Sequence, residues 1–88
     1  MVTDEIIGPL VPMFNQRVGS FLAKNALPSQ AACLKEFFYE LQNNSVRVAG
    51  VRVGPLIIFS VCDLIIEIDE SRSLVMDVRP GILSTSTI

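Results

Sequence analysis

Residues 45–79, SVRVAGVRVGPLIIFSVCDLIIEIDESRSLVMDVR, decide the fold class of this chain. They alternate apolar and polar side chains or run through β-branched residues, which is the pattern of β-strands. Residues 9–43 instead repeat apolar side chains at the spacing of a helix. The sequence therefore predicts an α+β fold in which two N-terminal helices precede a three-stranded antiparallel meander.

The segment VRVAGVRV at 46–53 predicts a bent strand. Counted by twos, its first two valines share one face and its last two share the other. A β-bulge at Ala49–Gly50 would return all four valines to one face and place Arg47 and Arg52 together on the opposite face. We prefer the bulge to a hairpin turn here, because that turn would put an alanine at positive φ.

A hairpin is predicted from 64 to 79, with its turn in the polar sequence ESRS. One face of the hairpin is apolar and the other is mostly polar. Pairing about Ser71 keeps the apolar set together. The expected pairs are Ile68 with Leu74, Ile66 with Met76 and Leu64 with Val78.

Two helices are expected in residues 9–43. In the first, an apolar stripe begins after Pro9, which is acceptable in a first helical turn. In the second, Ser29 is a plausible N-cap, and Asn43 with Asn44 is a plausible stop. The first stripe consists of Leu10, Phe14, Val18, Phe21 and Leu22, and the second of Leu34, Phe37, Phe38 and Leu41.

The composition indicates one small domain with an excess of apolar side chains. The chain has 88 residues, of which 50% are hydrophobic and 18% are charged. We divide this single domain, 1–88, into a helical half at 9–43, a β half at 45–79 and a tail at 80–88. A domain of this size has little interior, so we expect an apolar surface that another chain covers.

The expected docking surface lies in the strand segment LIIFSV, where both faces are apolar. Because a strand that is apolar on both sides must be covered twice, one layer would come from a protein partner or a second copy. We assign the partner-binding role to Ile57, Phe59 and Val61. Phe37 and Phe38 are further candidate anchors, although aromatic clusters of this kind more often form core.

The sequence carries no catalytic signature, and we expect no enzyme activity. It contains no histidine, so neither serine nor cysteine has its usual base. The carboxylates alternate with apolar residues, which marks them as the polar face of the hairpin rather than as a metal or catalytic pair. They are Asp63, Glu67, Asp69, Glu70 and Asp77. We expect no cofactor and no metal.

Direct nucleic-acid binding is the weaker alternative. The seven lysine and arginine residues are scattered, and the net charge is −2. Backbone contacts to nucleic acid require clustered cations. Arg47 and Arg52 are the candidate contacts if the chain is a weak single-stranded nucleic-acid module. Self-association as a small accessory protein is the other alternative.

Two further expectations concern the environment of the protein. Cys33 and Cys62 lie in apolar segments without CxxC spacing, which favours reduced thiols and a nuclear or cytoplasmic protein over a disulfide. The longest apolar run is interrupted by Asp63 and Glu67 well before the ~20 residues of a spanning helix. We therefore expect no membrane span.

The motif VRVAGVRV…LIIEIDESRSLVMDV resembles the small OB-fold subunits of replication, telomere and RecQ-mediated genome-instability complexes. In that family a first strand with a central glycine is followed by an apolar strand, an acidic turn and a third strand. Gly50, Asp69 and residues 74–78 occupy the corresponding places. The resemblance implies a partial OB-like barrel, completed by a partner, in a subunit of a genome-maintenance complex.

Overall fold

The fold is described by a computed structural model, which covers residues 2–9, 16–24 and 27–83 of the chain. It is an α+β structure with five strands, so the prediction of a three-stranded meander is wrong. The first strand precedes both helices, and the other four follow them. In chain order the elements are β1 (Thr3–Ile7), α1 (Gln16–Lys24), α2 (Pro28–Leu41), β2 (Val46–Val53), β3 (Leu56–Val61), β4 (Leu64–Asp69) and β5 (Leu74–Pro80).

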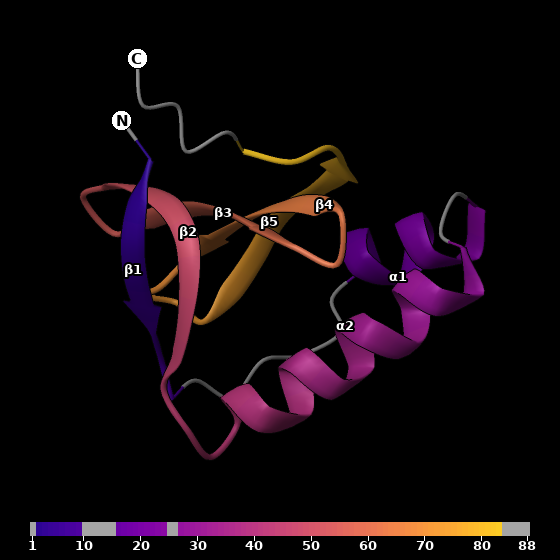
Figure 1. The fold of residues 1–88 in the computed structure, drawn as a ribbon, viewed down its shortest axis with the longest axis horizontal. Helices are drawn as coiled ribbons and strands as arrows, with labels where there is room; N and C mark the ends of the chain where they lie inside the picture. The colour runs from indigo at the N-terminus through magenta and orange to yellow at the C-terminus, as the bar shows by residue number, and fades with distance from the viewer. Residues whose placement is uncertain (1, 10–15, 25–26, 84–88) are drawn as a thin grey trace.

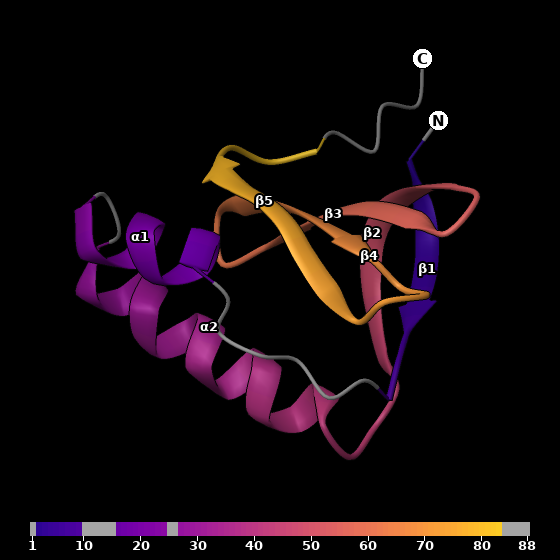
Figure 2. The same cartoon turned by 180° about the vertical axis from the view of Figure 1, so that it is seen from behind.

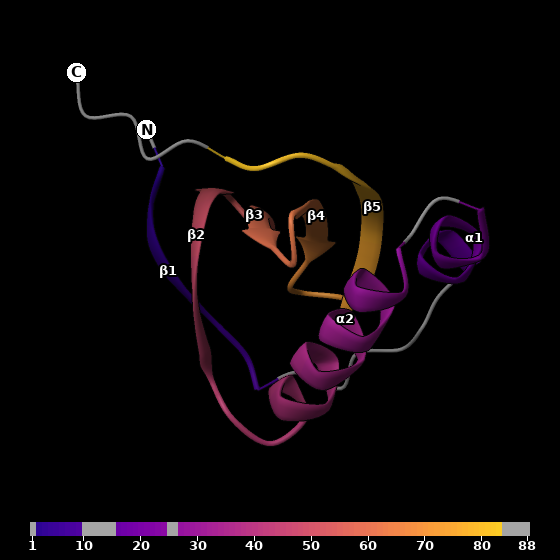
Figure 3. The ribbon, with the colours of Figure 1, turned by 45° about the vertical axis from the view of Figure 1, so that its right-hand side comes forward.

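The five strands form one antiparallel sheet in the order β1-β2-β3-β4-β5. The sheet is strongly curved, and α2 runs across its concave side (Figure 1). Figure 3 shows the strands arching over α2, which lies at the open side between β1 and β5. Helix α1 lies beside β5, as the view from behind also shows (Figure 2). We call the concave face, which meets α2, the inner face, and the convex face the outer face.

Strand β1 is the element that is hardest to predict from the sequence. Its sequence TDEII contains two adjacent acids and is followed by Gly8 and Pro9, which gives little sign of a strand. It pairs with β2 over its whole length, from Thr3 opposite Gly50 to Ile7 opposite Val46. Its acids are compatible with a strand at the edge of the sheet, where charged side chains discourage pairing with further chains.

The apolar stretch after Pro55 forms two strands, β3 and β4. They are joined by a turn at Cys62 and Asp63, with φ values of 56° and 59°. Two consecutive residues with positive φ are typical of the tight turns that join antiparallel strands. Because this turn contains neither glycine nor asparagine, the sequence gives no clear sign of it.

Strand β2 contains no bulge, so the predicted bulge at Ala49–Gly50 is wrong. It pairs in unbroken register with β1 on one side and with β3 on the other. Gly50 faces inward opposite Phe59, where a Cβ atom would lie 3.0 Å from the Phe59 Cβ. The glycine therefore provides room for a core side chain. Regular alternation then places Arg47 and Arg52 on opposite faces of the sheet.

The register between β4 and β5 also differs from the prediction. Ile66 pairs with Val78 and Ile68 with Val75, with a register shift between Glu67 and Ile68. The turn spans residues 70–73, because Asp69 and Leu74 form the last pair of the ladder. In β5 the buried side chains are therefore those of Val75 and Val78, and the face predicted for Leu74 and Met76 is wrong.

Helix α2 begins two residues earlier than predicted. Leu27 occupies the N-cap position and Pro28 the first helical position, so Ser29 lies within the first turn. The Leu27 N–H donates to the Gln30 side-chain oxygen at 3.1 Å. The helix ends at Leu41, shortly before the predicted stop. In the first stripe, Val18 and Phe21 are buried, whereas Leu10 and Phe14 lie outside the described residues.

The core lies between the inner face of the sheet and the apolar sides of the helices. The Phe37 ring on α2 packs against the rings of Phe38 and Phe59, with centroid distances of 5.5 and 5.7 Å. This core draws side chains from every helix and strand, so all seven elements depend on the same burial of apolar surface. Its members include Ile7, Val18, Leu34, Leu41, Val48, Ile57, Leu64, Ile66, Ile68, Val75 and Val78.

Candidate functional site

The residues predicted to bind a partner belong to the core. Ile57 and Phe59 are fully buried under the chain's own helices, and Phe37 and Phe38 are also buried. Val61 is half-buried against the same cluster. The prediction that these five side chains form an open docking surface is wrong, because α2 supplies the layer that was assigned to a partner.

An apolar surface does exist on the opposite side of the hairpin formed by β2 and β3. Val51 is paired with Ile58, and Val53 with Leu56, and all four side chains lie on the outer face. Val53 is 63% exposed, and the other three are half-buried. We call these four residues the outer patch. The sequence does signal it: without a bulge, alternation places the last two valines of β2 on the face opposite the first two.

An acidic side chain adjoins the outer patch on β4. Glu67 is directly opposite Ile58 in the ladder, and Asp77 of β5 is directly opposite Glu67. The carboxylate of Asp77 accepts a hydrogen bond from the Arg79 guanidinium at 2.7 Å. The row Val51–Ile58–Glu67–Asp77 therefore changes from aliphatic to acidic across the outer face.

The Arg52 side chain, at the end of the inner face, forms ion pairs with two carboxylates. Its Nε lies 3.1 Å from Glu5 Oε1, and its Nη1 lies 2.8 Å from Glu70 Oε1. Hydrogen bonds from the Thr3 hydroxyl and from Arg52 lower the pKa of Glu5, and the two carboxylates raise the pKa of Arg52. Arg47 is exposed on the outer face. The two arginines therefore do not form a shared strip for phosphate contacts.

Asp69 organises the turn between β4 and β5. One of its carboxylate oxygens accepts hydrogen bonds from the backbone N–H and hydroxyl of Ser71, at 3.0 and 2.6 Å. The other accepts from Arg72 Nε at 2.9 Å. These bonds, from Ser71 first and Arg72 second, hold the pKa of Asp69 below its ordinary value. The arrangement is that of a structural turn.

A disulfide joins Cys33 on α2 to Cys62 in the turn between β3 and β4. The expectation of reduced thiols is therefore corrected. The two residues are 29 positions apart in sequence, and their Cα atoms lie 5.9 Å apart. The Gln30 amide also donates to the Cys62 carbonyl oxygen at 3.4 Å. The helix is thus attached to the hairpin by a covalent bond and a hydrogen bond.

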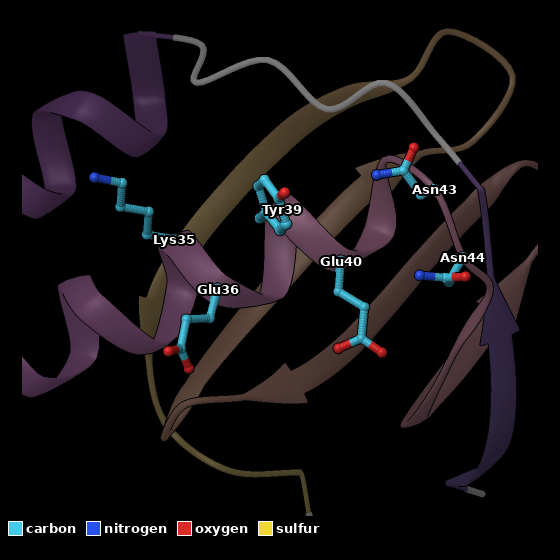
Figure 4. Close-up of a pocket in the computed structure, with 6 residues that line it drawn as sticks. All are labelled: Lys35, Glu36, Tyr39, Glu40, Asn43 and Asn44. Atoms are coloured by element: carbon cyan, nitrogen blue, oxygen red, sulfur yellow. The ribbon is translucent and has the colours of Figure 1, made fainter.

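A hollow of about 530 Å³ lies against the solvent side of α2. Its volume falls within the range of small-molecule sites, but its lining mixes charges of both signs around Tyr39, which is 72% exposed. Figure 4 shows the carboxylates of Glu36 and Glu40 directed to one side of the helix and the Lys35 amine to another. The polar groups do not converge on one point, so we do not assign a ligand here.

The acidic residues considered for metal binding are dispersed. Within 2–9, 16–24 and 27–83, no three histidine, cysteine, aspartate or glutamate side chains are grouped in a way that could hold a metal ion. Asp69, Glu70 and Asp77 are each engaged by an arginine instead. In the same ranges, no helix is long and apolar enough to cross a membrane.

Comparisons of the chain with protein-family models, with curated proteins and with solved structures find no match. The resemblance to small OB-fold subunits therefore stays a prediction. The functional argument depends on the surfaces of this chain alone.

Proposed function

We propose that this chain is a non-catalytic interaction subunit that docks onto a protein partner through the outer patch. One observation carries the proposal: four aliphatic side chains lie together on the outer face, and Val53 among them is 63% exposed. Contiguous exposed apolar surface of this kind marks protein-interaction sites.

The inner face cannot serve this role, because the chain covers it. The outer patch is held in place by the same hairpin that buries Ile57 and Phe59 on its other side. A binding surface on a rigid, well-packed element loses little conformational entropy on association. The β2–β3 hairpin therefore offers a preformed platform for a partner.

The test compares two substitutions with matched exposure. Val53→Asp places a charge in the outer patch, and Leu27→Asp places one at the start of α2, where Leu27 is 62% exposed. Both sites are open, so neither substitution buries a charge. Tagged wild-type and variant chains are used to capture partners from an extract of the source cells. The proposal requires that Val53→Asp abolish a specific capture that Leu27→Asp retains, and equal capture by both variants would refute it.

The finer assignment to a genome-maintenance complex rests on the OB-fold resemblance alone. Its test is the identity of the captured proteins: recovery of replication, telomere or helicase components would support it. Recovery of membrane-trafficking proteins instead would contradict the genome-maintenance assignment and indicate a general adaptor.

A further inference from the structure

We infer that the partner presents aliphatic side chains beside a lysine or arginine, and that this cation pairs with Glu67. The inference rests on the proposed docking function and adds the chemistry of the partner. It follows from the position of one carboxylate relative to the outer patch.

Glu67 lies where a docked chain would reach it. In the ladder it is the direct neighbour of Ile58, and neighbouring strands lie roughly 4.8 Å apart. Its side chain is on the outer face, because the adjacent Ile66 and Ile68 point into the core. A partner that covers Val51 and Ile58 therefore places its next side chain above Glu67.

The local charge favours a cation at this point. Glu67 is directly opposite Asp77, and like charges in such a cross-strand pair disfavour each other. Arg79 is paired with Asp77 at 2.7 Å, and among the ion pairs of the described residues none joins Glu67. A cationic side chain of the partner would form an ion pair with Glu67. An acidic partner would instead be repelled by the negative charge of Glu67.

A second copy of the chain is a poorer source of this cation than a basic partner. The chain has a net charge of −2, and Arg52, Arg72 and Arg79 are each paired with a carboxylate of the same chain. Arg47 is exposed on the outer face, but it lies opposite Ile6 near the start of β2, away from the pairs Val51–Ile58 and Val53–Leu56. Two copies stacked through their outer faces would bring two Glu67 side chains into one small interface. We therefore assign the surface to a different, basic protein.

The test uses two synthetic helical peptides that share one leucine stripe and carry either lysine or glutamate at every flanking position. Binding to the full chain is measured by fluorescence anisotropy in 50 mM and 300 mM salt. We expect the lysine peptide to bind at least about fivefold more tightly at low salt, with a smaller difference at high salt. Glu67→Lys should weaken lysine-peptide binding by about three- to tenfold. Glu40→Lys, an equal charge change on α2, should leave the ratio of the two affinities unchanged.

The Glu67→Lys variant is a suitable probe because it should keep its fold. The new ammonium group faces Asp77 across the strands, which replaces a like-charge pair with an opposite-charge pair. Loss of lysine-peptide binding in this variant therefore reports on the surface rather than on unfolding.

The outcomes separate the inference from the function on which it rests. If both peptides bind equally and Val53→Asp abolishes this binding, the inference of a basic partner is overturned. The proposal that the outer patch is a docking surface would still hold. Binding that Val53→Asp does not change, or no binding of either peptide, would overturn both. A dimer at micromolar concentration, dissociated by Val53→Asp in light scattering, would overturn the inference in favour of a second copy.

Discussion

Gly50 on β2 lies directly opposite Phe59 on β3, and both face the inner side of the sheet. A Cβ atom at position 50 would lie 2.8 Å from the Ile58 carbonyl oxygen and 3.0 Å from the Phe59 Cβ. Because these are strand atoms, they cannot move without disturbing the ladder. The aromatic core of the protein thus requires a glycine on the neighbouring strand.

Gly50→Ala should therefore destabilise the fold by about 1–3 kcal/mol through overpacking. The matched control is Gly19→Ala in α1, where a Cβ would meet no atom within 4 Å. That substitution should stabilise the helix by about 0.5–1 kcal/mol. Urea unfolding of both variants measures the difference. Equal effects of the two substitutions would show that the contact at Gly50 is not limiting.

Substitutions on the two faces of the β2–β3 hairpin should differ in cost. Phe59→Ala removes a fully buried ring and should cost about 3–5 kcal/mol. Val53→Ala removes exposed methyl groups and should change the free energy of unfolding by about 0.5 kcal/mol or less. Chemical denaturation provides the measurement, with Phe59→Leu as a milder variant if the alanine form does not fold. Similar costs on both faces would contradict the assignment of inner and outer sides.

The disulfide should contribute substantially to stability. Its ends are 29 positions apart, and closing a loop of that length in the unfolded chain is worth about 3–4 kcal/mol. Cys33→Ser with Cys62→Ser should lower the free energy of unfolding by this amount. Reduction of the wild type should have the same effect and leave the double variant unchanged. If the oxidised protein yields two titratable thiols, the bond is absent.

The disulfide is also relevant to the cellular compartment of the protein. Stable disulfides are typical of oxidising compartments, whereas the nuclear or cytoplasmic location that we predicted was argued from reduced thiols. Thiol trapping in cells that express the protein will distinguish the two environments. Trapped free thiols would support the original prediction, and resistance to trapping would support an oxidising compartment.

Stability should fall in acid. Hydrogen bonds lower the pKa of Asp69 and of Glu5 in the folded state. A carboxyl with a lowered folded pKa stabilises the protein above its unfolded value, at about pH 4, and loses that contribution as the pH falls through the folded pKa. The melting temperature should therefore decrease below about pH 4. Asp69→Asn should make this decrease shallower, and an unchanged pH profile in that variant would contradict the role of Asp69.

Periodicity in the sequence predicted some local structure well. The apolar stripe Leu34–Leu41 is buried in α2, and Ile66 and Ile68 point into the core as their alternation indicates. Errors arose where local patterns are ambiguous. The acidic edge strand β1 and the turn at Cys62–Asp63 lack the usual signals, so their structure depends on tertiary pairing.

The site was misplaced for a related reason. The prediction that Ile57 and Phe59 are open assumed more apolar strand surface than two short helices can cover. The sheet instead curves around α2 (Figure 3), and the side chains of α2 and α1 together bury its inner face. The excess apolar surface is therefore on the outer face at Val51 and Val53, which an assumed bulge had turned inward.

Site-specific photo-cross-linking from position 53 tests the docking surface most directly. A photoreactive phenylalanine analogue replaces Val53 in one sample and the equally exposed Leu27 in another, and both are irradiated in cells of the source organism. Our account predicts a discrete adduct with another protein from position 53, suppressed by Val51→Asp, and no such adduct from position 27. Adducts from position 27 alone, or the same adducts from both positions, would contradict it.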